Sequence, residues 1–170
     1  MGDTGVASTV VDAGPLIHLG EIGALSLLRL FPAIYIPGAV WQEAVASGRV
    51  VSADLEILPN LHRCELLPES VARFSHAYSL THLHTGERES LYVCVQDNIH
   101  LILTDDLAVR KAAKLLESIP VGSLGVIIKA YKLHMLTLSQ AEQYILDLQD
   151  VSSLFVTRAI VELALESLYR

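Results

Sequence analysis

The chain contains few cysteines, few aromatic residues and few charges. Of its 170 residues, 2 are cysteine, 6% are aromatic and 18% are charged. Cys64 and Cys94 lie far apart and form no CxxC pair. This excludes a small scaffold held together by disulfides and favours a reducing compartment, so we expect a cytoplasmic protein.

Positive charge is also scarce, since the formal net charge is −7 and the sequence pI is about 5.4. This balance argues against a protein that grips nucleic acid with a broad basic face. An acidic protein can still act on phosphodiesters if bound metal ions reverse the sign of its site. The positions of the acidic residues therefore decide the question.

We expect neither a membrane span nor a signal peptide. The longest stretch with little charge, Ile22 to Trp41, carries Arg29 and is interrupted by Pro32 and Pro37, which would break a continuous helix. The N-terminal residues 1–5 lack the positive region of a signal peptide. We expect no membrane association.

Apolar side chains, in contrast, are abundant: 52% of the residues are hydrophobic and the mean hydropathy is +0.45. A chain of this length forms one domain with a substantial core. The apolar excess is more than a monomer hides easily, which predicts a homodimer formed through an apolar helix face.

Short β-rich runs alternate with helical patterns along the chain. Strands are predicted at Ala7–Val11, Ala33–Ile36, Arg63–Leu67 and Leu101–Thr104, with an edge strand near Val121. Helices are predicted at Leu16–Leu30 with a break at Gly20 and Gly23, then at Ala39–Ala46, Glu69–Leu80, Glu87–Gln96, Leu107–Glu117, Ser123–His134, Ser139–Leu148 and Phe155–Tyr169. This alternation with short connections is typical of a doubly wound α/β sheet.

Carboxylates follow two of these strands directly. Asp12 comes after the first predicted strand. Asp105 and Asp106 come after the fully apolar strand at Leu101–Thr104, which is predicted to lie at the centre of the sheet. Sites in such sheets form beyond the carboxyl ends of the strands. Like charges gathered there cost free energy unless a cation compensates them. The alternative for each aspartate is a helix cap, and one of the adjacent pair is expected to cap the next helix.

Glu87 begins the core-facing stripe of its helix, on one face with Cys94 and Val95. Thr85 is the predicted N-cap of this helix. Glu89 lies on a polar face and is predicted to be solvated. Glu87 is therefore a candidate metal ligand, with a first-turn glutamate favoured by the helix dipole as the alternative.

Four more residues join the candidate set. Glu43 lies on the short helix after the second strand and is either a site residue or an ordinary glutamate at an amphipathic edge. Thr104 or Ser8 could hydrogen-bond a carboxylate or a phosphate. Arg110 follows the acidic pair on a helix and either faces solvent, steers a phosphate or pairs with Asp106.

Histidines do not indicate a zinc site. His82 and His84 form an H-x-H pair in a predicted loop, but no second pair stands at a ligand spacing. We therefore predict oxygen ligands and a hard divalent ion.

The acidic residues belong to an ordered set of short motifs. These are Val-Val-Asp-Ala-Gly-Pro-Leu-Ile at 10–17, Ile-Pro-Gly-Ala-Val-Trp-Gln-Glu at 36–43, Thr-Gly-Glu-Arg-Glu-Ser-Leu at 85–91, Leu-Thr-Asp-Asp at 103–106 and Gly-Ser-Leu-Gly-Val at 122–126. The set resembles the PIN-domain family, which includes metal-dependent ribonucleases and the VapC-type toxins of toxin–antitoxin pairs. Each motif alone is a weak signal, whereas their order is specific.

The resemblance implies a three-layer α/β sandwich, with a central parallel sheet flanked by helices. It covers residues 8–135, so we expect a PIN-like core at 1–135 and a helical extension at 136–170 of the same domain. It further implies Mg²⁺ or Mn²⁺ as the cofactor, single-stranded RNA as the substrate and a possible small antitoxin as a partner.

By the same resemblance, the catalytic residues are Asp12, Glu43, Glu87 and Asp106. Asp12 and Glu87 would be metal ligands, and a Thr-x-Asp pattern selects Asp106 as another. Asp105 as the ligand with Asp106 as the cap remains open. Carboxylate oxygens suit Mg²⁺ and Mn²⁺, which activate water for attack on phosphorus.

Two other functions compete with a ribonuclease. One is a PIN-like scaffold that binds nucleic acid or protein without significant catalysis. The other is a phosphatase of the haloacid-dehalogenase type, which is disfavoured because no aspartate stands two residues after Asp12.

Overall fold

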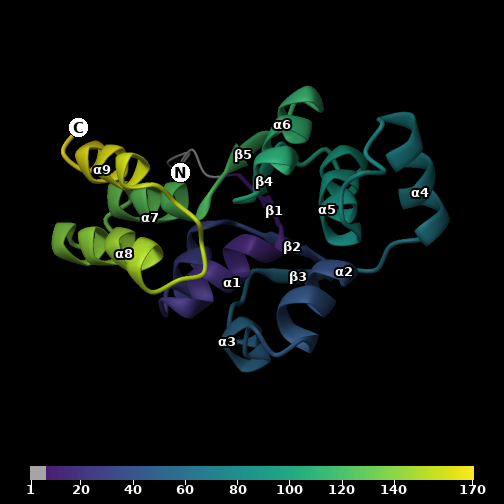
Figure 1. Cartoon of the computed structure of the whole chain (residues 1–170). Coiled ribbons are helices and arrows are strands. Elements are labelled where there is room, and N and C mark those ends of the chain that lie inside the picture. The colour runs from purple at the N-terminus through teal and green to yellow at the C-terminus, as the bar shows by residue number, and fades with distance from the viewer. Residues whose placement is uncertain (1–6) are drawn as a thin grey trace, which may run out of the picture.

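The computed structural model describes residues 7–170, so the N-terminal segment considered for a signal peptide lies outside the described residues. A five-stranded sheet in the order β3-β2-β1-β4-β5 forms the centre of the molecule (Figure 1). Its strands are β1 at Thr9–Val11, β2 at Ile34–Pro37, β3 at Leu61–Cys64, β4 at Leu101–Leu103 and β5 at Ile119–Val121. All four strand pairs are parallel, which confirms the predicted parallel α/β sheet.

Helices connect the strands and close the chain. They are α1 at Ala13–Glu21, the 3₁₀ helix η1 at Leu25–Leu30, α2 at Gly38–Trp41, the π-helix η2 at Gln42–Ala46, α3 at Ser52–Glu56, α4 at Pro68–Ala77, α5 at Thr85–Gln96, α6 at Leu107–Leu115, α7 at Ser123–Lys132, α8 at Leu138–Asp150 and α9 at Arg158–Ser167. Parallel strands require such crossovers, because each must begin again at the same end of the sheet.

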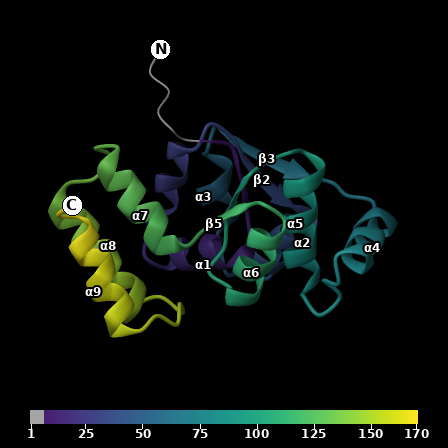
Figure 2. The same ribbon diagram turned by 90° about the horizontal axis from the view of Figure 1, so that it is seen from above.

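The side chains of the central strands alternate between two cores. Val11 and Leu103 belong to the core that includes α1 and α7, whereas Val10 and Ile102 belong to the core under α4, α5 and α6. The period-two alternation of a strand sends neighbouring residues to opposite faces. The sheet is therefore covered on both sides, which confirms the three-layer sandwich (Figures 1 and 2).

Two predicted elements, the third strand and the last helix, have wrong boundaries. The third strand lies earlier than Arg63–Leu67, because Leu61 pairs with Ile34 and sets the register. The last helix begins at Arg158 rather than Phe155, since the Thr157 hydroxyl accepts a hydrogen bond from the backbone N–H of Ile160 and starts the helix there.

The stretch from Ile22 to Trp41 is divided among η1, β2 and α2. Gly23 has a φ of +69° in the turn that separates α1 from η1, a conformation that glycine adopts without strain. Across residues 7–170, no helix has the length and apolar character needed to cross a bilayer.

The last two helices pack on the same core as the sheet. Ile145 and Leu148 of α8 and Val161 of α9 are buried in the cluster that contains Val11 of β1. The three C-terminal helices lie at the end of the molecule opposite to α4 (Figure 2). Residues after 135 thus share the hydrophobic core of the sheet.

Candidate active site

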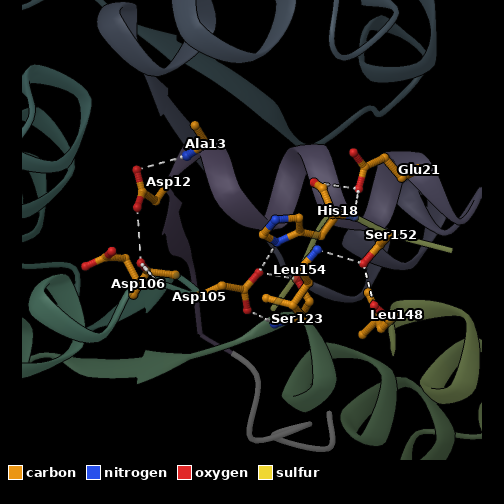
Figure 3. A network of polar contacts seen from close by, with 12 residues as sticks. Asp12, Ala13, His18, Glu21, Asp105, Asp106, Ser123, Leu148, Ser152 and Leu154 are labelled. Atoms are coloured by element: carbon orange, nitrogen blue, oxygen red, sulfur yellow. Dashed lines mark hydrogen bonds and ion pairs between the residues drawn. The ribbon is translucent and has the colours of Figure 1, made fainter. Parts of the chain in front are cut away.

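The chain reverses its direction of winding between β1 and β4. These strands pair side by side, with Val11 opposite Leu103, and the backbone N–H of Asp12 donates to the carbonyl of Leu103 at 2.9 Å. Ligands of open α/β sheets bind at such a switch point, outside the carboxyl ends of the strands. The topology therefore brings Asp12 next to the segment that carries Asp105 and Asp106 (Figure 3).

A cavity of about 280 Å³ opens at this edge of the sheet. All five predicted acidic residues line it. The complete lining is Asp12, Ala13, Gly14, His18, Glu43, Glu87, Asp105, Asp106, Leu154 and Phe155. The carboxylates come from the ends of two strands, from η2 and from α5, so separate segments of the sequence converge on one space.

Asp12 is the most buried of these acids, with 5% of its surface exposed. Its Oδ1 accepts from the backbone N–H of Ala13 at 2.9 Å, and its Oδ2 accepts from the Thr104 hydroxyl at 3.1 Å. The pKa of Asp12 is raised to about 7, because burial and, to a lesser extent, the negative charges of Glu87 and Glu43 outweigh the effect of these two hydrogen bonds. The Asp12 side chain thus caps α1, and its negative charge is disfavoured by burial and by the neighbouring acids.

Glu87 lies in the first turn of α5 and is half-buried. Its Oε2 accepts from the backbone N–H of His84 at 2.9 Å. His84, not Thr85, is the N-cap of the helix, so that prediction is wrong. The sequence placed Cys94 and Val95 together on the core-facing stripe of this helix. Cys94 is buried, but Val95 is 41% exposed, so the buried stripe is narrower than predicted.

Glu43 reaches the site through a contact between two helices. Its Oε2 lies 3.3 Å from the position that a Cβ on Gly86 would occupy. Nearby, the Oε2 of Glu89 accepts from the backbone N–H of Ala39 at 2.8 Å. Glu89 therefore joins the start of α2 to α5, and the prediction that it is solvated is wrong. The absence of a side chain at Gly86 lets Glu43 approach the first turn of α5.

Asp105 connects three elements (Figure 3). Its Oδ1 accepts from the backbone N–H of Ser123 at 2.7 Å. Its Oδ2 accepts from the Ser123 hydroxyl at 2.6 Å and lies 2.7 Å from Nδ1 of His18. A Cβ at Gly122 would lie 2.8 Å from Oδ1 of Asp105, so only glycine leaves room for this arrangement. The carboxylate fastens the end of β4 to α1 and to the start of α7.

His18 and Ser123 were not among the residues predicted for the site. Ser123 lies two residues after the end of β5, as the first residue of α7, so its position beyond a strand end is a usable signal. His18 lies within α1, and no local pattern separates it from the other histidines of the sequence.

Asp106 is the helix cap of the adjacent pair. Its Oδ1 accepts from the backbone N–H groups of Ala108 at 2.8 Å and Val109 at 3.0 Å, at the start of α6. The Thr104 hydroxyl, which donates to Asp12, accepts from the N–H of Asp106 at 3.3 Å. Nη1 of Arg110 donates to the backbone carbonyl of Thr104 at 3.2 Å. The hydrogen bond of Arg110 is therefore to the backbone and not to the Asp106 carboxylate.

The chemistry of these side chains fits a hard divalent cation. Within residues 7–170, no group of three His, Cys, Asp or Glu side chains is close enough together to hold a metal as the side chains stand. The donors around the cavity are nevertheless carboxylate oxygens, which Mg²⁺ and Mn²⁺ prefer. The raised pKa of Asp12 marks negative charge that a cation would relieve.

The match to known families covers nearly the whole chain. The PIN domain family matches residues 8–170. No match to a curated protein was found. PIN domains are generally nucleases that bind nucleic acid and use divalent metal ions. With its parallel sheet and its acid-lined cavity at the switch point, the chain belongs to the PIN domain family.

Proposed function

We propose that this protein is a metal-dependent endoribonuclease that cleaves single-stranded RNA. The observation that carries the proposal is the buried Asp12 carboxylate, whose pKa is raised to about 7 beside Glu87 and Glu43 in one cavity. Desolvation and like charges at a cleft are the means by which active sites perturb acidic groups. The general nuclease activity of the family supports the same conclusion.

We assign Asp12, Glu87 and Asp106 as the metal ligands. Both hydrogen bonds of Asp106 fall on Oδ1, so Oδ2 keeps its lone pairs for a cation. Asp105 uses both of its oxygens, for Ser123 and His18. This difference favours Asp106 as the ligand and gives Asp105 a positioning role.

A divalent metal, when bound, supplies positive charge for the phosphate and lowers the pKa of a water molecule. Glu43, exposed at the cavity, would orient a water molecule for attack on phosphorus and accept its proton. As the water oxygen bonds to phosphorus, the bond from phosphorus to the leaving sugar oxygen would break, and that oxygen would take up a proton from solvent, to which Glu43 then releases its own. The hydrogen bonds from Ala13 and Thr104 keep the Asp12 carboxylate in one orientation.

A cleavage assay tests this function. The protein is incubated with labelled single-stranded RNA over a titration of Mn²⁺ or Mg²⁺, with an EDTA control and a generic phosphatase substrate in parallel. We expect internal cleavage of RNA that requires metal, and no phosphate release from the generic substrate. RNA bound equally well in EDTA and in Mn²⁺, without cleavage, would favour a scaffold, and phosphate release would favour a phosphatase.

The partners follow from the same proposal. We infer a cytoplasmic homodimer, since Leu146 of α8, Leu163 of α9 and Tyr169 beyond α9 are exposed and a stable interface covers about 800 Å² per partner. Analytical ultracentrifugation is expected to give twice the 18.5 kDa of the chain. A clean monomer would leave this apolar surface to another partner.

A small antitoxin would inhibit the enzyme by placing Arg or Lys among the acids.

A further inference from the structure

A second cavity of about 610 Å³ adjoins the acidic one. Asp105, Leu154 and Phe155 line both cavities, so the two are adjacent and share a wall. Most of the other lining side chains are apolar, among them Leu107, Val121, Leu124, Val156 and Ile160, and Arg110 is the cation. We call this second cavity the apolar groove.

Phe155 stands at the boundary between the acidic cavity and the apolar groove. Its side chain is 93% exposed, more than any other large hydrophobic residue in the described part of the chain. Phe155 therefore buries almost none of its apolar surface within the monomer. The exposed Phe155 ring is therefore available to contact a ligand that binds beside the two cavities.

The segment around Phe155 is fastened to the rest of the molecule on both sides. The Ser153 N–H donates to Oε2 of Glu21 at 2.6 Å, and the Leu154 N–H donates to the Ser152 hydroxyl at 3.1 Å (Figure 3). Leu154 and Val156 pack against the main core. The exposed ring is thus held by ordered neighbours, which lowers the entropy lost when a ligand binds.

We propose that Phe155 is a stacking platform for a nucleobase of single-stranded RNA, one nucleotide away from the phosphate at the acids. The inference rests on the proposed function and adds a substrate-positioning residue to it. Aromatic side chains beside a strand-binding groove stack with any base, because every base has a π-face. A strand that leaves the acidic cavity across the shared wall would meet Phe155, which lines both cavities.

The apolar groove also suits the phosphate that follows this base. Arg110 lines the groove and can offer further guanidinium N–H groups besides the one on Thr104. The groove therefore combines an apolar surface for bases with one guanidinium group for a phosphate, on a chain whose net charge is −7.

The test compares Phe155→Ala and Phe155→Trp with the wild-type protein in Mn²⁺. Binding and cleavage are measured on one single-stranded RNA and on a series in which successive positions are abasic. Stacking contributes about 1–3 kcal/mol per base, so we expect Phe155→Ala to weaken affinity about fivefold to a hundredfold, and Phe155→Trp to retain it. One abasic position should weaken wild-type binding by a similar factor and leave Phe155→Ala unaffected.

Leu115→Ala is the matched control, because it removes an 86% exposed apolar side chain at the opposite end of α6. It should leave affinity unchanged. If wild-type protein cleaves RNA and Phe155→Ala binds it equally well, the stacking inference is wrong while the nuclease stands. If wild-type protein neither binds nor cleaves RNA, the proposed function itself fails. A wild-type dimer that becomes a monomer in Phe155→Ala, with RNA affinity unchanged, would assign the ring to an interface between copies and overturn the inference.

Discussion

Asp12 and Asp105 follow neighbouring strands at the same edge of the sheet, but their carboxylates have different surroundings. Asp105 accepts hydrogen bonds on both oxygens from Ser123 and faces His18. Asp12 is buried with two acceptor contacts, and its pKa rises because burial and the charges of Glu87 and Glu43 outweigh them. The negative charge of the carboxylate after β4 is therefore stabilised by its hydrogen-bond partners, whereas the negative charge of the carboxylate after β1 is disfavoured by burial and by its acidic neighbours.

The largest expected effect is on catalysis at the β1 side. Asp12→Asn keeps an oxygen for the Ala13 N–H but removes the charge that holds a cation. Metal chemistry supplies several kcal/mol of transition-state stabilisation, so we expect metal-dependent cleavage to fall by about 10³-fold or more. Single-turnover cleavage of single-stranded RNA measures the loss. Asp54→Asn, an exposed aspartate on α3, is the control, and full activity in Asp12→Asn would sink the assignment.

The second prediction concerns stability without metal. The pKa of Asp12 is raised from 3.8 to about 7 on folding, so its ionisation costs stability that increases between these pH values and stays constant above 7. Asp12→Asn removes this cost. At about 1.4 kcal/mol per pKa unit, its advantage in unfolding free energy should widen by about 2–3 kcal/mol from pH 5 to pH 8.

Urea unfolding in EDTA at the two pH values measures this advantage. An advantage that is independent of pH, or largest at pH 5, would show that burial of the Asp12 charge does not weaken the fold.

The same substitution on the β4 side should have the opposite sign. Asp105→Asn replaces charge-assisted hydrogen bonds to Ser123 and His18 with weaker neutral ones. We expect the unfolding free energy to fall by about 1–2 kcal/mol at pH 8, where Asp12→Asn raises it. Thermal unfolding of both variants in EDTA gives the comparison directly. If both variants gain stability, the two sides of the edge do not differ as described.

The smallest expected effect is that of Glu89, a carboxylate that positions the helix leading to Glu43. Glu89→Ala removes the cap of α2 at Ala39, which should cost about 0.5–2 kcal/mol of stability. Because Glu89 also holds the helix that leads to Glu43, we expect kcat to fall severalfold while KM stays the same. Glu69→Ala, an exposed first-turn glutamate of α4, is the control. Unchanged kcat would mean that Glu43 keeps its place without this link.

Much of the fold could be predicted because its signals are local. The apolar run at Leu101–Leu103 and the carboxylates after it identify a central parallel strand by composition alone. The strand at Leu61–Cys64 was placed too late because its residues are half-buried or exposed, so no alternating pattern marks an edge strand. The start of α9 was misplaced because Phe155 extends the apolar pattern without belonging to the helix.

The sequence by itself determined that acids follow the strands, because a carboxylate after a β-run is a local feature of the chain. It also left open whether Asp105 or Asp106 caps α6. Tertiary structure decided that question, since the partners of Asp105 come from α1 and α7, at His18 and Ser123. The surroundings of Asp12 depend on burial by the whole fold, and the neighbours of Phe155 come from distant segments. Such features arise only when remote residues meet, and no periodicity in the sequence records them.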